Sequence, residues 1–234
     1  TGNIASGYES LRYNTTGSYN VASGWQSLLN NTEGSYNVAS GYHALRANTT
    51  GTYNVASGYQ TLYSNTTGDH NLASLYRSLW QNTTGSNNIA IGTQSLYSNT
   101  TGGSNVASGY RSLFSNTTGN FNVASGYQSL YANTTGSSNV AIGGGAGRYI
   151  ANGSTVNQTS GTSIYIGGNT KALADGGANE IVIGYNAIGN GSNTVTLGNT
   201  SVTKTILQGN VGIGTTNPTE KLHVEGNIEL INGG

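Results

Sequence analysis

The sequence contains few of the residues that cross-link a fold or concentrate charge. It has no cysteine and one proline, and charged residues make up 7% of its 234 positions with a formal net charge of zero. The absence of cysteine excludes disulfides and thiolate metal sites. The neutral balance argues against nucleic acids and anionic membranes as partners, because both are bound through clustered Lys and Arg. No apolar run approaches the roughly 18 residues of a membrane-spanning helix, so we expect no membrane insertion.

What the sequence has instead is a repeat. A 17-residue unit, NVASGYQSLYSNTTGSY in its commonest form, runs through residues 1–143. A constant step of this kind is typical of a solenoid, in which each repeat stacks on its neighbours. The first Asn of the unit recurs at Asn3, Asn20, Asn37, Asn54, Asn71, Asn88, Asn105, Asn122 and Asn139. This Asn column predicts an amide ladder along the stack.

Each column of the unit predicts a local structure. An apolar residue, an Ala and a Ser or Ile follow the first Asn, which indicates one short β-strand per coil. The Ala column implies a neighbour too close for a larger side chain. An aromatic residue, a Leu three positions later and an apolar residue after it favour a short helical corner. The closing Asn-Thr-Thr-Gly predicts a turn whose Gly suits a left-handed or tight backbone.

A single coil of this composition is thin. Many of its residues are Gly, Ser, Thr or Asn, so one chain is expected to have difficulty enclosing a core and covering both faces. We therefore predict association of several copies through the small Ala-bearing face.

The repeat changes after residue 143. Residues 144–162 form a polar, Gly-rich excursion, and residues 163–202 return to strand-like segments whose last two glycines, Gly184 and Gly198, lie 14 apart. We attribute the shorter step to loss of the helical corner. Residues 203–234 carry alternating apolar segments that predict a small β neck or cap, with strands expected at 205–207, 210–213, 221–224 and 227–230.

Two segments resemble known fibre proteins. The unit NEIVIGYNAIGNGS followed by NTVTLG resembles the head repeats of trimeric autotransporter adhesins, the YadA-like head. The segment GNVGIGTTNPTEKLHVEG at 209–226 resembles a part of phage and prophage tail-fibre proteins that precedes a self-cleaving chaperone domain. The resemblance implies an all-β, left-handed parallel β-roll wound as a homotrimer. It also implies an extracellular place, in a virion tail fibre or a cell-surface appendage, and a role in host attachment.

The sequence offers little for catalysis. Its acidic residues are scattered over Glu9, Glu33, Asp69, Asp175, Glu180, Glu220, Glu225 and Glu229. Paired-carboxylate hydrolysis needs two acids about 5–10 Å apart in one cleft, and no coil supplies such a pair. We interpret the adjacent Asp69 and His70, and the lone His43 and His223, as surface residues rather than metal or acid–base groups. We predict no catalytic residue, no metal site and no cofactor.

One column varies more than the others and is the candidate binding site. Because a buried column would not accept Tyr, Asn and Ser equally, we expect it to be exposed, and exposed aromatic residues suit contact with a glycan or a protein receptor. Its larger members, with Arg12, Arg46, Arg77 and Arg111 expected nearby, are Tyr19, Tyr36, Tyr53, His70 and Phe121.

A second column satisfies the N-glycosylation sequon, at Asn14, Asn48, Asn65, Asn82, Asn99, Asn116 and Asn133. Turn formation explains this column without glycosylation, and we favour that interpretation.

Three functions remain open at this point. The first is the structural shaft of an extracellular trimeric fibre, with a contribution to host-surface or glycan binding. The second is an ice-binding solenoid, because the first Thr of each Asn-Thr-Thr would form a regular Thr ladder. The third is a polysaccharide-degrading tailspike, which the scattered acids disfavour.

Overall fold

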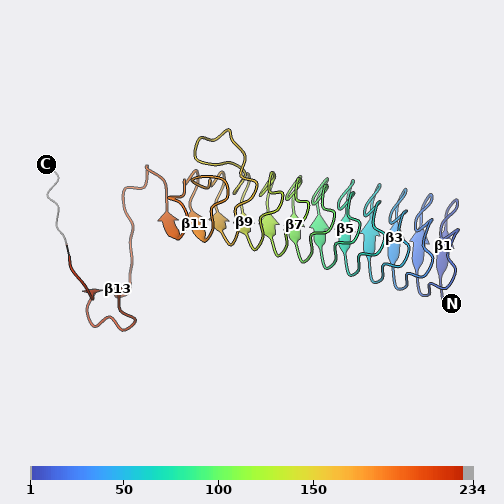
Figure 1. The fold of residues 1–234 in the computed structure, drawn as a ribbon, viewed down its shortest axis with the longest axis horizontal. Coiled ribbons are helices and arrows are strands. Elements are labelled where there is room, and N and C mark those ends of the chain that lie inside the picture. Colours follow the sequence, from blue (N-terminus) through green and yellow to red (C-terminus); the bar gives the residue numbers. More distant parts are fainter. Residues whose placement is uncertain (1, 229–234) are drawn as a thin grey trace. The chain divides into compact units, whose positions relative to one another are not determined.

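The computed structural model describes residues 2–228, and within them it contains strands and turns but no helix. The chain divides into two compact units, Thr1–Asn199 and Thr200–Gly234. Figure 1 shows the first unit as a stack of similar coils, each carrying one strand. The predicted all-β parallel solenoid is thereby confirmed.

One parallel sheet runs the length of this unit. Twelve strands lie side by side in chain order, and each pairs in parallel with the next. From β1 to β9 the partners are 17 positions apart, as in Val38 with Val55. The strands are β1 (Ile4–Ser6), β2 (Val21–Ser23), β3 (Val38–Ser40), β4 (Val55–Ser57), β5 (Leu72–Ser74), β6 (Ile89–Ile91), β7 (Val106–Ser108), β8 (Val123–Ser125), β9 (Val140–Ile142), β10 (Ile164–Ile166), β11 (Glu180–Ile183) and β12 (Thr194–Leu197).

We number the coils from the N-terminus, and each begins at the position of the first Asn. Coils 1 to 8 are residues 3–19, 20–36, 37–53, 54–70, 71–87, 88–104, 105–121 and 122–138. Coils 9, 10 and 11 are residues 139–162, 163–179 and 180–193.

A single chain encloses its own core. Successive strand side chains point to opposite faces, so the Ala of each strand from β2 to β9, such as Ala56, points inward and is 0% exposed while Val55 and Ser57 face outward. The Leu of each corner, such as Leu62, is also 0% exposed. The expectation that the Ala-bearing face joins copies is therefore wrong, because strand alternation places that face inside each coil.

The predicted helical corners are also wrong. Gln26 and Leu28 have φ angles of 52° and 50°, in the left-handed region, and their counterparts in the other regular coils repeat this. Their amides bond to other coils, with Gln26 N donating to Tyr8 O at 2.8 Å and Leu28 N to Ala44 O at 3.0 Å. A helix would bond within its own segment. Here the corner alternates its backbone conformation so that it pairs with the coils on both sides.

The predicted Asn ladder is present. In coil 5 the side chain of Asn71 donates from Nδ2 to Asn54 Oδ1 at 3.1 Å and to Gly85 O at 2.9 Å. Asn54 Oδ1 also accepts the backbone amide of Asn71 at 3.0 Å. The ladder residues Asn20 to Asn139 are 0–1% exposed, so each buried amide is satisfied by its neighbours in the stack.

The turn glycines have a different role from the one predicted. Their φ angles are not in the left-handed region. The residue with a left-handed φ lies two positions later, as Tyr19 does after Gly17. A Cβ on Gly17 would lie 2.3 Å from Gly34 O and 2.5 Å from Asn14 Oδ1. Glycine is required there because the next coil and the turn Asn come too close for any side chain.

The Gly-rich excursion is a loop inserted into coil 9. Val140 of β9 pairs with Ile164 of β10, a step of 24 positions. Between them the chain folds back on itself, with Ile150 N donating to Thr155 O at 2.9 Å and Asn157 N to Arg148 O at 3.0 Å. Figure 1 shows this loop projecting from the stack beside β9.

Coil 11 is the shorter coil, since Ile181 pairs with Val195, 14 positions on. Its corner is retained, because Asn186 N donates to Gly168 O and Gly189 N to Lys171 O, both at 2.9 Å. The missing residues therefore come from the turn and not from the corner, contrary to our attribution. This coil opens with Glu180 in place of Asn.

The second unit contains one small parallel sheet, formed by β13 (Val211–Ile213) and β14 (Leu222–Val224). These strands agree with the expected segments 210–213 and 221–224. Residues 205–207 form no strand, and the expected strand at 227–230 lies partly outside the described residues.

A candidate binding surface of aromatic columns and arginines

The structure places the predicted variable column on the surface of the solenoid. Tyr19, Tyr36 and Tyr53 are 55%, 47% and 51% exposed, and their rings stack with centroids 5.2 and 4.9 Å apart. His70 extends the stack at 4.9 Å from Tyr53. Phe121 lies farther along the column and is 65% exposed.

Every residue of this column has a positive φ, between 55° and 60°. The left-handed conformation turns these side chains outward at the point where the chain leaves the Asn-Thr-Thr-Gly turn. The ring stack ends after His70, because the next residues of the column, Asn87 and Ser104, have no ring.

Two further aromatic columns border the corner. The residue after the strand Gly is aromatic in most coils and exposed, and Tyr42, Tyr59 and Tyr76 stack at 5.1 and 5.5 Å. The residue after the corner Leu forms a second stack, from Tyr63 through Trp80, Tyr97 and Phe114 to Tyr131, with centroids 5.0–6.0 Å apart. The spacing of these residues in the sequence had indicated a helical corner, so their common surface was not predicted.

The arginines lie against these two corner columns. Arg77 has its guanidinium carbon 5.1 Å from the Tyr76 centroid and 5.7 Å from Trp80. Arg111 repeats this arrangement, at 5.1 Å from Tyr110 and 5.3 Å from Phe114. Arg12 also contacts the ring of Tyr13, and Arg148 the ring of Tyr149, which are their neighbours in the sequence. Among the described residues, the other arginine–ring contacts are to rings of the two corner columns, and none is to the variable column.

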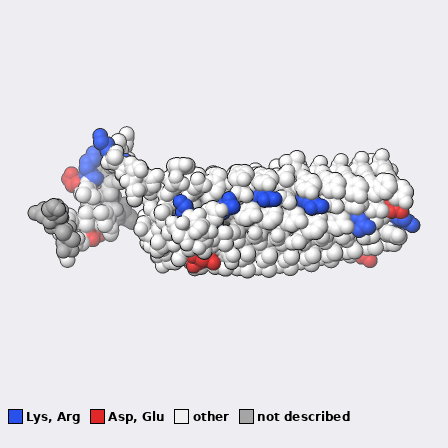
Figure 2. All heavy atoms as spheres, turned by 90° about the horizontal axis from the view of Figure 1, so that it is seen from above, with Lys and Arg blue, Asp and Glu red and all other residues white. Residues whose placement is uncertain are grey.

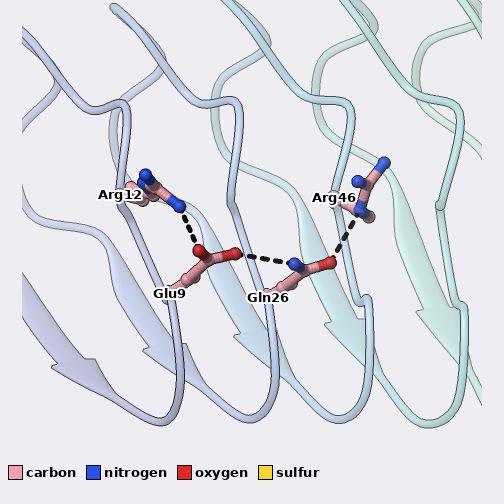
Figure 3. Close-up of polar contacts among 4 residues, drawn as sticks. All are labelled: Glu9, Arg12, Gln26 and Arg46. Atoms are coloured by element: carbon pink, nitrogen blue, oxygen red, sulfur yellow. Dashed lines mark hydrogen bonds and ion pairs between the residues drawn. The ribbon is translucent and has the colours of Figure 1, made fainter.

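Glutamines of the preceding coils hold the guanidiniums in place. Arg77 Nε donates to Gln60 Oε1 and Arg111 Nε to Gln94 Oε1, each at 2.8 Å. Figure 3 shows the start of the same chain of contacts, in which Glu9, Gln26 and Arg46 are joined in series and Arg12 binds Glu9. Stacking on rings and bonding to amides fix these long side chains before any ligand arrives.

The charge on this surface is almost uncompensated. In the part of the chain that the structure describes, the one ion pair joins Arg12 to Glu9. Figure 2 shows the basic side chains of the solenoid following one line along the face in view. We call Arg12, Arg46, Arg77, Arg111 and Arg148 the arginine row.

His43 belongs to the same surface and is not the solvated residue expected. Its ring stacks on Tyr42 with centroids 3.8 Å apart, and neither ring nitrogen has a hydrogen-bond partner among the described residues. Burial lowers the pKa of His43, and the positive charge of Arg46 lowers it further. Both effects favour the neutral form of His43.

The sequon column is buried and hydrogen-bonded. Asn65 Nδ2 donates to Asn48 Oδ1 and to Gly68 O, both at 2.9 Å, and Asn65 is 0% exposed. These residues form a second Asn ladder, which the sequence interpretation as turn formation only partly anticipated. In the folded coils 3 to 8 the side-chain nitrogen is not accessible for glycosylation.

The Thr ladder considered for ice binding is engaged within the chain. Thr49 Oγ1 donates to Thr66 O at 3.0 Å, and the corresponding Thr of other coils does the same. The following, more exposed Thr row contains Glu33 in coil 2.

The described residues contain no group of three or more His, Cys, Asp or Glu side chains that could hold a metal ion. The same part of the chain has no helix with the length and apolar character to cross a membrane. No family model, curated protein or solved structure matches the chain.

Proposed function

We propose that this chain is the structural shaft of an extracellular fibre built as a homotrimer, of the virion tail-fibre or cell-surface adhesin type. Support comes from the outer face of the long sheet, which a single chain leaves uncovered. Val38, Val55 and Ile89 on this face are 40%, 39% and 38% exposed. Ile91 and Ile142 in the neighbouring row are 44% and 46% exposed.

Every strand from β1 to β9 contributes its first and third residues to the same outward face. The row of first residues is apolar throughout, from Ile4 to Val140, whereas the row of third residues is Ser except at Ile91 and Ile142. An extended apolar surface of this kind is usually covered by another protein surface. Sister copies are the occupants that fit a face repeating with the coil step, since each copy presents the same rows at the same spacing. Three copies around one axis agree with the YadA-like resemblance of the 14-residue unit.

The internal bonding of the coils suits a load-bearing role. Strand pairing and two buried Asn ladders join each regular coil to the next. The alternative of ice binding has less support, because the hydroxyl groups of the first Thr row already donate hydrogen bonds to carbonyl oxygens of neighbouring coils.

Mass in solution tests this proposal. We expect static light scattering to give three times the mass of one chain over a wide range of concentrations. Placing a charge on the outer sheet face, with Val38→Lys and Val106→Lys in coils 3 and 7, should lower the mass toward one chain, because a buried unpaired ammonium is costly.

The matched control is Thr50→Lys with Thr118→Lys, which puts the same charges on exposed turn positions of the same two coils. This variant should keep the parental mass. A wild-type chain that is monomeric at every concentration would overturn the trimeric shaft.

A further inference from the structure

The arginine row has a period of two coils. Arg12, Arg46, Arg77, Arg111 and Arg148 belong to coils 1, 3, 5, 7 and 9. The row draws on two neighbouring columns, because Arg77 and Arg111 follow the aromatic residue whereas Arg12 and Arg46 follow the corner Leu. The alternation of coils is nevertheless unbroken over nine coils.

The even coils supply the glutamines. Gln26, Gln60, Gln94 and Gln128 lie in coils 2, 4, 6 and 8, and each accepts a bond from the arginine of the next odd coil. Since strands in a sheet lie about 4.8 Å apart, successive guanidiniums lie about 10 Å apart along the stack. From coil 1 to coil 9 the surface therefore carries one arginine in every second coil.

The guanidiniums keep groups for a ligand. Arg77 and Arg111 use Nε for their glutamine, and neither has a bond from its terminal nitrogens to any described residue. A guanidinium recognises a carboxylate or sulfate through two parallel N–H donors. The tyrosines on either side, such as Tyr76 and Tyr110, are 41% and 40% exposed and can offer hydroxyl groups to a polar polymer.

We infer that the arginine row binds a linear acidic polysaccharide that carries one anionic group on every second sugar, aligned with the solenoid axis. One pyranose in an extended chain spans about the height of one coil, so alternate sugars meet alternate coils. The edges and hydroxyl groups of the stacked tyrosines between the arginines then lie opposite the neutral sugars. The inference deepens the proposed function and rests on it only in expecting a ligand outside the cell.

A nucleic acid fits this surface less well. Phosphates in one strand recur about every 3.4 Å, so roughly two of every three would lie opposite no arginine. The ring columns also stack on themselves, with Tyr97 and Phe114 at 5.0 Å and 6°, which leaves their faces covered and unable to receive bases.

Calorimetric titration of the full chain with defined polymers tests the inference. Hyaluronate has a carboxylate on every second sugar and should bind, whereas neutral dextran should not. Replacing Arg46, Arg77, Arg111 and Arg148 together by Gln should weaken hyaluronate binding by about tenfold or more, because the charge-assisted bonds are lost.

The decisive variant keeps the charge and breaks the period. Arg77→Gln with Gln94→Arg moves one guanidinium from coil 5 to coil 6 within the same column. We expect it to weaken binding severalfold, because the period is broken and Arg111 also loses its Gln94 partner. Equal binding by this variant, binding of dextran, or tighter binding of single-stranded oligothymidylate would each overturn the inference. A trimer that does not bind hyaluronate would overturn the polysaccharide inference but not the proposed trimeric shaft. A monomer that binds hyaluronate would overturn the trimeric shaft but not the polysaccharide inference.

Discussion

At the scale of single residues, asparagine organises the interior more than any apolar side chain does. In coils 2 to 8 two Asn positions per coil are buried, and each is hydrogen-bonded to neighbouring coils. A buried polar group is tolerated only when its hydrogen bonds are complete. Neighbouring coils provide these hydrogen bonds, so the Ala and Leu rows suffice as an apolar core.

Removing one rung should therefore be costly. Asn82→Ala removes the donor to Asn65 Oδ1, at 2.8 Å, and one of the two acceptors of Asn99 Nδ2, at 2.7 Å. We expect the free energy of unfolding to fall by about 3 kcal/mol, measured by urea denaturation. Thr84→Ala, at an exposed position of the same turn, should change it by less than about 0.5 kcal/mol. Equal effects of the two substitutions would contradict the ladder.

His43 gives the solenoid a pH dependence. Because burial and Arg46 lower the pKa of His43, the unfolded chain binds a proton more readily than the folded one. The contribution is complete above the unfolded pKa of about 6.5 and is lost as the pH falls below it. In His43→Gln, which installs the residue found at Gln26 and Gln60, thermal melting between pH 7 and pH 5 should vary less than in the parent. An unchanged pH profile would show that His43 is solvated.

At the scale of elements, the strands were predictable and the corners were not. Alternation around Ala, with Gly after each strand, specifies a short strand with one buried face. The corner's i, i+3, i+4 spacing is compatible with a helix, but the stack offers its amides partners in neighbouring coils. Leu at a positive φ, as at Leu28, is a conformation that residue propensity does not anticipate.

The candidate binding surface was only partly predictable for a related reason. The exposed column of Tyr19, Tyr36 and Tyr53 could be recognised by its variability. Four members of the arginine row were named from the sequence, but beside the variable column and not beside the corner rings that they contact. Their period was missed because they occupy two columns of the repeat. The period becomes visible once the coils are stacked and Arg77 is seen to reach Gln60.

Coil 5 carries a local defect in the strand-to-corner junction. Leu75 stands where the other regular coils have Gly, with a φ of 81° against 128–150° for those glycines. The next coil's bond, Gly92 N to Ser74 O, is 3.3 Å long, whereas Gly41 N to Ser23 O is 2.8 Å. Leu75→Gly should raise the free energy of unfolding by about 1 kcal/mol, since strain is removed and Leu75 is 52% exposed.

The reciprocal change gives the control. Gly41→Leu would set a Cβ 2.4 Å from Gly58 O and should destabilise the chain. Chemical denaturation of both variants measures the difference. A loss of stability in Leu75→Gly would mean that the leucine packs usefully and that its backbone is not strained.

At the scale of the whole molecule, the regular coil step determines the spacing of residues on the outer sheet face and in the arginine row. It aligns the apolar rows of the outer sheet face, from which we propose the trimer, and it sets the interval of the arginine row. Both proposals fail if residues one repeat apart are not neighbours in space.

Cross-linking between coils tests that adjacency most directly, because the parent has no cysteine to interfere. Ser40 and Ser57 are partners in β3 and β4, and strands about 4.8 Å apart place their Cα atoms within the range that a disulfide spans. Ser40→Cys with Ser57→Cys should form an intrachain disulfide under mild oxidation, whereas Ser40→Cys with Ser74→Cys, two coils apart, should not. Equal intrachain cross-linking of both pairs, or none in the adjacent pair, would contradict the stacked solenoid.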